Sequence, residues 1–345
     1  MKTYLQEKVD AYLNRRDFLK IMGILGISFA ASPNSIAMPL TEVKFDKKLH
    51  KVEHTLPLMG TNVTISVLDE SVNRAEEAVE TGFDNIRKLS AIFDRFKTNT
   101  TVGILNADGQ IKDVPPQLLE VLNKSVYYYR LSEGAFDVTV KPLVDLLKDS
   151  FIRTGKPPAE KEIREALRLV GSDKLYFSKQ MVKLQEGMGV TFDGIAKGYI
   201  VDKTAELIKN MGVKYALINA GGDIRAIGNR KWKVAIRDPF NLNNYVDVVV
   251  LNNNAIATSG NYEIYFDKEK LYCHIVNPTT GISPRLSSST SVVAETVADA
   301  DALSTTAFVF KPLQAKRFLE KLGKQGLIIT HQGIKVATKD WPGLA

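Results

Sequence analysis

The chain has 345 residues, of which 44% are hydrophobic and 25% are charged, as in a globular protein of one large domain or two small ones. Its formal net charge is +7, but the sequence has no lysine or arginine run of the kind that follows a nucleic-acid backbone, so we expect no nucleic-acid partner. A single cysteine, Cys273, excludes an intramolecular disulfide. Four histidines without a Cys-x-x-Cys pair argue against a structural zinc site.

The N-terminus has the features of a targeting segment. Residues 14–20, Asn-Arg-Arg-Asp-Phe-Leu-Lys, resemble a twin-arginine export signal, and an apolar stretch over 21–31 is too short for a stable membrane anchor. Ser35-Ile36-Ala37 fits a small-x-small cleavage site. An amphipathic N-terminal helix is the alternative. We predict a signal peptide over 1–37 and a periplasmic mature domain over 38–345, exported as a folded protein.

The first half of the mature chain is predicted to be mainly helical. Residues 51–68 alternate apolar and polar side chains around a turn at 57–61, which indicates two short strands. Apolar residues at spacings of three and four predict a long helix over 71–94. Residues 97–113 are polar and are predicted as a loop. Pro115-Pro116 opens a helix to Leu131, and two further helices are predicted over 140–149 and 158–170.

The second half is dominated by short strands. They are predicted at about 174–177, 181–184, 214–218, 232–236, 246–250, 254–257, 271–276 and 289–294. Helices are predicted over 195–211, 299–310 and 312–322, with a hairpin near 326–337. Because helices and strands do not alternate strictly, the sequence predicts an α+β fold with mainly antiparallel sheet in one compact, two-lobed domain.

Residues 190–202, Val-Thr-Phe-Asp-Gly-Ile-Ala-Lys-Gly-Tyr-Ile-Val-Asp, form the first candidate site. They are predicted as a strand, a tight turn and a helix N-terminus. Backbone N–H groups at a helix N-terminus attract an anion such as phosphate. Neither a Walker loop nor a Rossmann fingerprint is present. A plain connection between elements is an equal alternative.

Four further stretches carry candidate chemistry. Glycine and small hydroxyl residues follow apolar runs at 219–223 and 257–262, where simple turns are equally expected. Asp301 and Thr305 are four apart on a predicted helix, so they share a face and offer hard oxygen ligands to Mg²⁺, unless the aspartates only favour the helix dipole. His274 lies in a predicted strand and is a candidate base, although a lone strand histidine is more often structural. Its neighbour Cys273 is predicted to be a small core or surface residue.

Eight motifs in one order link these stretches to a family. Together they resemble the FAD:protein FMN transferases, the ApbE-type flavin transferases, over about residues 53–337. The motifs are Met59-Gly60-Thr61, Ala135-Phe136-Asp137-Val138-Thr139 with Pro142-Leu143-Val144, Asp193-Gly194-Ile195-Ala196-Lys197-Gly198-Tyr199, Asn219-Ala220-Gly221-Gly222-Asp223, Ile236-Arg237-Asp238-Pro239, Ala257-Thr258-Ser259-Gly260, His274-Ile275-Val276-Asn277-Pro278-Thr279-Thr280-Gly281 and Ala300-Asp301-Ala302-Leu303-Ser304-Thr305.

The resemblance implies an ApbE-like α+β fold, related to the T-fold, with an FAD site between two lobes. It implies transfer of FMN from FAD to a threonine or serine hydroxyl of a partner protein, with release of AMP and a requirement for Mg²⁺. The implied metal ligands are Asp301 and Thr305 with a backbone carbonyl of Gly194 or Ala196. His274 would help to deprotonate the acceptor hydroxyl, and Asp301 would be catalytic through the metal. The implied FAD contacts are Met59, Ala135, Phe136, Asp137, Thr191, Lys197, Ile275 and Ser304.

This chain departs from the commonest family pattern at its centre. Many members read Asp-hydrophobic-Gly-Gly-Ile-Ala-Lys-Gly, whereas the first and third positions here are Thr191 and Asp193, so a carboxylate has moved by two residues. Phe96 stands where a tyrosine is common. The variant resembles the periplasmic branch that serves nitrous oxide respiration, which implies a flavoprotein of a membrane redox complex as the client. Two rival functions are a periplasmic FAD-binding protein without transfer activity and an FAD pyrophosphatase.

Overall fold

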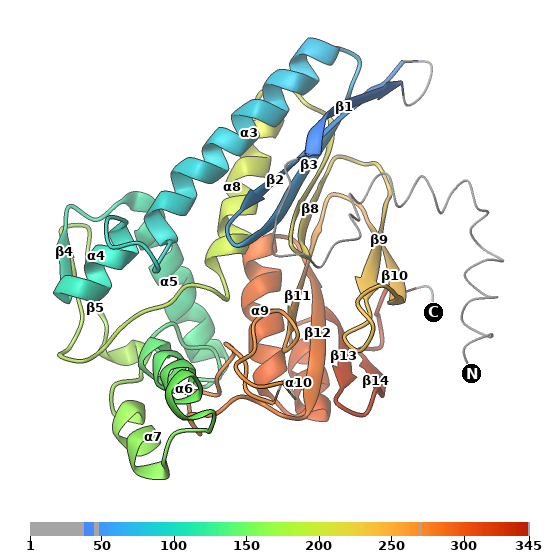
Figure 1. Cartoon of the computed structure of the whole chain (residues 1–345). Helices are drawn as coiled ribbons and strands as arrows, with labels where there is room; N and C mark the ends of the chain where they lie inside the picture. Colours follow the sequence, from blue (N-terminus) through green and yellow to red (C-terminus); the bar gives the residue numbers. More distant parts are fainter. Residues whose placement is uncertain (1–37, 45–47, 269–270, 344–345) are drawn as a thin grey trace.

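The computed structural model describes residues 38–44, 48–268 and 271–343 (Figure 1). The predicted signal peptide, residues 1–37, lies outside the described residues. In the part that is described, no helix combines the length and the apolar character needed to span a bilayer.

A nine-stranded antiparallel sheet forms the centre of the molecule (Figure 1). Each neighbouring pair in it is antiparallel, which confirms the predicted fold class. In spatial order its strands are β1 (Met38–Lys44), β2 (His50–Leu58), β3 (Thr61–Asp69), β7 (Tyr215–Ala220), β8 (Asp223–Ile227), β11 (Ala255–Gly260), β12 (Ser287–Ala294), β13 (Gln325–Thr330) and β14 (Lys335–Ala337).

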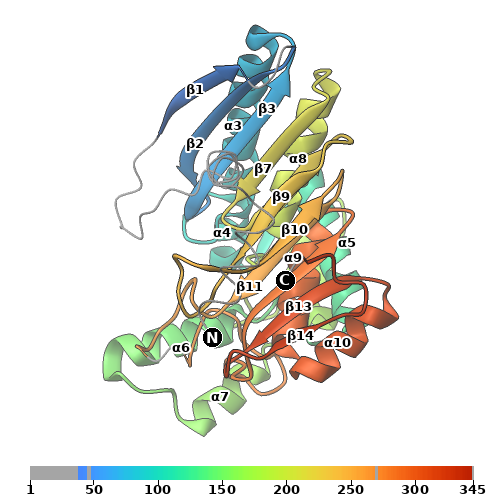
Figure 2. The same ribbon diagram turned by 90° about the vertical axis from the view of Figure 1, so that its right-hand side faces the viewer.

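Both faces of this sheet are covered (Figures 1 and 2). Helices cover one face: α3 (Val72–Phe93), α8 (Ala196–Asn210), α9 (Val297–Val309) and α10 (Pro312–Lys321). A two-stranded sheet of β9 (Trp232–Arg237) and β10 (Tyr245–Leu251) covers the other. Successive side chains of a strand point to opposite faces of the sheet, and this explains the two cores. Val63, Ile65 and Val67 of β3 belong to the helix-side core, whereas Leu68 packs with Trp232 on the opposite side.

A second lobe lies beside the helix-covered part of the sheet (Figure 1). It contains α4 (Thr101–Asp108), α5 (Pro116–Leu131), α6 (Lys141–Thr154), α7 (Glu160–Leu167) and a 3₁₀ turn (Ser172–Lys174). A small sheet joins β4 (Gln110–Lys112), β6 (Met181–Lys183) and β5 (Tyr176–Phe177). Leu105 and Leu122 of this lobe belong to the same core cluster as Ile86 and Phe93 of α3, so the two lobes share one core.

The prediction of a loop over 97–113 is wrong, because α4 and β4 lie in this stretch. Thr100 caps α4 by accepting a 3.1 Å hydrogen bond from the Gly103 N–H, and Val102 and Leu105 are fully buried. The polar residues of this stretch concealed a short helix that places Val102 and Leu105 in the core and leaves Ile104 exposed.

Two predicted strands are also wrong, and three observed strands, β1, β4 and β8, were not predicted. Residues 271–276 form an irregular loop with only an isolated bridge between Tyr265 and Cys273. Cys273 was predicted as a small core or surface residue, and it is a buried core residue. Residues 190–192 are extended but belong to no sheet of the described chain. Strand β8 follows the Gly221-Gly222 turn and was missed, since its five residues carry too little periodicity of their own.

Candidate active site

A cleft that is open to solvent brings together most of the predicted motifs. Its walls come from the loop before α6, the turn before α8, strand β11, the loop after β11 and the face of α9. Ten of the predicted site residues line it, namely Ala135, Phe136, Asp137, Thr191, Gly194, Lys197, His274, Ile275, Asp301 and Thr305. Segments up to about 170 residues apart in the chain therefore meet at one place.

Three predicted site residues do not line this cleft. Met59 lies in the β2–β3 turn with a left-handed φ of +54° and packs against the core. Ala196 is buried at the first position of α8. Ser304 is fully buried, and its hydroxyl lies 2.8 Å from that of Ser259. Ser304 therefore lies behind the cleft wall and supports Ser259, which does line it.

Two glycines allow α8 and the turn before it to lie against α9. A Cβ on Gly198 would lie 2.6 Å from the Val297 carbonyl oxygen, and one on Gly194 would lie 2.9 Å from Thr305 Oγ1. Both separations are below normal contact distance, so only glycine fits without a shift. At this junction the Gly198 N–H donates a 3.2 Å hydrogen bond to Asp301 Oδ2.

Three charged groups meet in the lining of the cleft, namely Lys197, Asp223 and Asp301. Lys197 Nζ lies 3.2 Å from Asp223 Oδ2, and Asp301 is buried nearby. Burial alone would lower the pKa of Lys197, but the carboxylates of Asp223 and Asp301 hold it above its ordinary value. Burial, and then the charge of Asp223, raise the pKa of Asp301 well above its ordinary value. Two carboxyl groups thus share one ammonium group, and the raised pKa of Asp301 reflects the cost of a second negative charge at this place.

This donor set fits Mg²⁺. A divalent cation would offset the negative charge of Asp301, and Thr305 Oγ1 lies on the same helix face, 3.2 Å from Ser259 Oγ. In the described ranges, no cluster of three or more histidine, cysteine, aspartate or glutamate side chains is arranged for a metal. Mg²⁺ needs no such cluster, because it binds through one or two carboxylates and takes its other ligands from phosphates and water.

The Asp137 carboxylate stabilises the wall of the cleft through hydrogen bonds. Its carboxylate accepts hydrogen bonds from the N–H and hydroxyl of Thr139, at 2.8 and 2.6 Å, and from the N–H and hydroxyl of Ser172, at 3.1 and 2.7 Å. Burial raises its pKa, while these donors oppose the shift. Both carboxylate oxygens therefore accept hydrogen bonds that stabilise the loop carrying Ala135 and Phe136.

His274 faces the cleft from the irregular loop after β11. Its Nδ1 lies 3.2 Å from the Ile264 carbonyl oxygen, and because a carbonyl only accepts, the contact requires a proton on Nδ1. In the neutral ring Nε2 is then a proton acceptor. Burial lowers the pKa of His274, so the neutral ring is the dominant form at neutral pH.

Asp223, Ser259 and Arg95 are functional candidates that the sequence reasoning did not select. Asp223 follows the Gly-Gly pair, and Ser259 lies in the 257–262 stretch, so local signals pointed to both regions without identifying the side chain. Arg95 had no local signal. It contacts Asp193, which lines the cleft, across 98 residues of sequence.

Comparisons with known proteins agree with this geometry. The model of the ApbE family matches residues 59–329. An FAD:protein FMN transferase of Haemophilus influenzae is 30% identical over 307 residues, which cover 83% of this chain and 88% of that protein. One of Vibrio cholerae is 30% identical over 281 residues, or 75% of this chain and 81% of that protein.

The crystal structure of the ApbE protein from Thermotoga maritima superposes with a TM-score of 0.78 at 27% identity, covering 84% of this chain and 97% of that one. The predicted ApbE-like fold and the family resemblance are therefore confirmed. Sequence, fold and cleft lead to one conclusion: the chain belongs to the ApbE family.

Proposed function

We propose that the protein is an FAD:protein FMN transferase, which moves FMN from FAD onto a threonine or serine hydroxyl of a client protein and releases AMP. The observation that carries this proposal is the meeting of Asp301, Thr305 and Lys197 in the lining of one solvent-open cleft. The names of the relatives from Haemophilus influenzae and Vibrio cholerae support the same reaction.

In this proposal Mg²⁺ is held by Asp301, Thr305 and a backbone carbonyl of Gly194 or Ala196. When bound, it supplies positive charge to the pyrophosphate of FAD. The position of Lys197 supports a similar role, since its ammonium group is charged at neutral pH and lines the cleft. The positive end of the α8 dipole lies at the same end of the cleft, although the Gly198 N–H is already bonded to Asp301.

The remaining proposed contacts orient FAD. Ala135, Phe136 and Ile275 would supply apolar surface, Thr191 a hydroxyl, and Asp137 the support of the wall, because its carboxylate is already occupied. Ser304 does not line the cleft and would act through Ser259. Met59 does not line the cleft either, so its proposed contact with FAD would lie outside the cleft lining.

His274 is the proposed base. Its Nε2 would take the proton of the acceptor hydroxyl as that oxygen bonds to the phosphorus of the FMN moiety. The bond from this phosphorus to the bridging oxygen breaks, and AMP leaves with the bond electrons. The product is a phosphoester between FMN and the client. A hydroxyl is a poor nucleophile at neutral pH, so a neutral histidine at the cleft supports this assignment.

We also propose export through a twin-arginine signal over residues 1–37, which places the mature domain, 38–345, in the periplasm. Thr191 and Asp193 favour the branch that serves nitrous oxide respiration, and the client is then a flavoprotein of a membrane redox complex. Fusing residues 1–37 to a reporter that fluoresces only when it is exported folded tests the route, and replacing Arg15 and Arg16 by lysine should abolish export.

The reaction is tested by incubating the protein with FAD, Mg²⁺ and candidate client domains, and then looking for a fluorescent band after denaturing electrophoresis. Asp301→Ala should lose labelling, whereas Asp84→Asn, at an exposed site on α3, should retain it. Tight stoichiometric FAD binding with no labelled client would favour the simple FAD binder. AMP released at full rate without any client would favour the pyrophosphatase.

A further inference from the structure

Residues 189–195 lead into α8 without support from a sheet. They lie outside every sheet of the described chain, and yet they carry Thr191, Asp193 and Gly194 to the cleft. The backbone of Thr191 makes one 2.7 Å hydrogen bond, from its N–H to the Val138 carbonyl oxygen. The position of this segment must therefore come largely from side chains of neighbouring elements.

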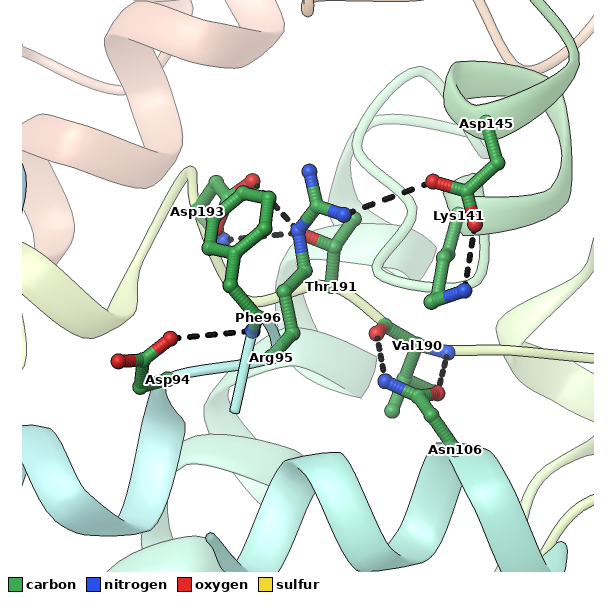
Figure 3. A network of polar contacts seen from close by, with 9 residues as sticks. All are labelled: Asp94, Arg95, Phe96, Asn106, Lys141, Asp145, Val190, Thr191 and Asp193. Atoms are coloured by element: carbon green, nitrogen blue, oxygen red, sulfur yellow. Dashed lines mark hydrogen bonds and ion pairs between the residues drawn. The ribbon is translucent and has the colours of Figure 1, made fainter. Parts of the chain in front are cut away.

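Asn106 of α4 holds the start of the segment (Figure 3). Its side-chain amide donates a 2.9 Å hydrogen bond to the Val190 carbonyl, and its side-chain oxygen accepts a 2.7 Å hydrogen bond from the Val190 N–H. The Asn106 side chain thus replaces the pair of hydrogen bonds that a neighbouring strand would have made.

Arg95 holds the end of the segment (Figure 3). Its Nε lies 3.0 Å from Asp193 Oδ2, and its Nη1 lies 3.6 Å from Asp145 Oδ1 on α6. Lys141 neutralises the other oxygen of Asp145 at 2.5 Å, and the Arg95 guanidinium lies 4.3 Å from the centre of the Phe96 ring. The Arg95 side chain is only 8% exposed, so its pairing is more than a surface contact.

The residue after Asp193 is Gly194, which lies directly against Thr305. Arg95 therefore holds the turn from one side while α9 limits it from the other. We infer that Arg95 is a positioning residue that acts through Asp193 to set the backbone carbonyl of Gly194 or Ala196 opposite Asp301 and Thr305. This inference rests on the proposed function, and it gives the displaced carboxylate of this chain a role: it pairs with Arg95.

A general structural role for Arg95 makes different predictions. Asp193 is 41% exposed, so water can solvate it when Arg95 is removed, and Asp145 keeps Lys141 as a partner. Loss of Arg95 should then loosen the turn without unfolding the domain. An altered response to Mg²⁺ with a nearly unchanged melting temperature separates positioning from general stabilisation.

The test compares Arg95→Met, Arg95→Lys and Asp193→Asn with the wild type. The matched control is Arg164→Met, which breaks an exposed 3.2 Å ion pair with Glu160 on α7. FAD binding is followed by flavin fluorescence as Mg²⁺ is titrated, and hydrogen exchange is measured by peptide mass spectrometry. We expect Arg95→Met and Asp193→Asn to raise the Mg²⁺ midpoint by about 10- to 100-fold, the range seen for residues that orient metal ligands.

We also expect faster exchange confined to residues 190–196, a partial return toward wild type in Arg95→Lys, and no change in Arg164→Met. The Arg95→Met/Asp193→Asn double variant should be no worse than Arg95→Met alone, because both changes break one pair. An unchanged Mg²⁺ midpoint in both single variants, or exchange that accelerates throughout the chain, would overturn the inference. Should Mg²⁺-dependent FAD binding respond as expected while no client is ever labelled, the transferase proposal fails and the positioning role stands.

Discussion

The Asp202 carboxylate on α8 accepts a 2.9 Å hydrogen bond from the backbone N–H of Val297, the first residue of α9. Its second oxygen accepts a 2.8 Å hydrogen bond from the Ala298 N–H. One side chain thus caps the helix that carries Asp301 and ties it to the helix that carries Lys197. The relative position of the two helices, on which the cleft depends, is set in part by this contact.

The stability of the protein should depend on the ionisation of Asp202. Burial raises its pKa to about 6, against the opposing effect of the Val297 and Ala298 N–H groups. Because the folded state then holds the proton more tightly than the unfolded state, the contribution of Asp202 to stability is full below about pH 4 and is lost as the pH rises through about 6.

We therefore expect the wild type to lose at most about 3 kcal/mol of unfolding free energy from this group between pH 4 and 6, by the linkage of pKa to stability. Urea unfolding at several pH values measures it. Asp202→Asn should remove the contribution of this carboxyl group, so the unfolding free energy of the variant should change less between pH 4 and 6. Identical pH dependence in the two proteins would contradict the assignment.

Gly198→Ala should disturb the contact between α8 and α9. Its Cβ would lie 2.6 Å from a backbone oxygen of Val297, which cannot rotate away, so the helices must separate. We expect a loss of about 1–3 kcal/mol, the usual cost of overpacking, together with weaker FAD binding. Thermal unfolding and flavin fluorescence report the two effects. Glu206→Ala, at an exposed position of the same helix, is the control and should alter neither.

Lys197→Met should destabilise the lining of the cleft. Removing the ammonium group leaves Asp223 and Asp301 buried together without a counter-charge, and breaking a buried pair in this way costs about 3 kcal/mol or more. Denaturant unfolding without Mg²⁺ measures the loss. The Lys197→Met/Asp223→Asn double variant should recover part of it, because only one carboxylate then remains. A double variant less stable than Lys197→Met would count against the shared-charge description.

His274→Gln should slow FMN transfer and leave FAD bound. A general base contributes about 10²- to 10⁴-fold to a rate, so we expect a loss of turnover in that range with little change in FAD affinity. Since burial lowers the pKa of His274, the wild-type rate should fall on the acid side only below the ordinary histidine range. Single-turnover rates across pH test this. If the rate of His274→Gln still falls at low pH as in the wild type, another group must be responsible for that fall.

Local patterns were sufficient for the long or strongly periodic elements. The stripe of Ala75, Val79, Phe83 and Ile86 predicted α3, and its bounds in the structure differ from the prediction by one residue at each end. The spacing of Asp301 and Thr305 placed both on one helix face, and both line the cleft. These features depend on residues close in sequence, so periodicity and capping chemistry are enough to recognise them.

Short elements and irregular segments were not predictable in this way. Helix α4 has eight residues and β8 has five, so each is too short for a clear periodic pattern and depends on packing partners from distant parts of the chain. The loop of His274 resembles a strand in composition, but in the structure it makes only an isolated bridge. Tertiary packing overrides local preference at such places.

The sequence by itself determined the family, the order of the motifs and the residue types that the reaction needs. Only the tertiary structure decided the pairing of Lys197 with Asp223 and of Arg95 with Asp193. The reason is physical: a local pattern records which face of an element is buried, whereas an ion pair between distant residues exists only after packing has brought two elements together and excluded water from between them.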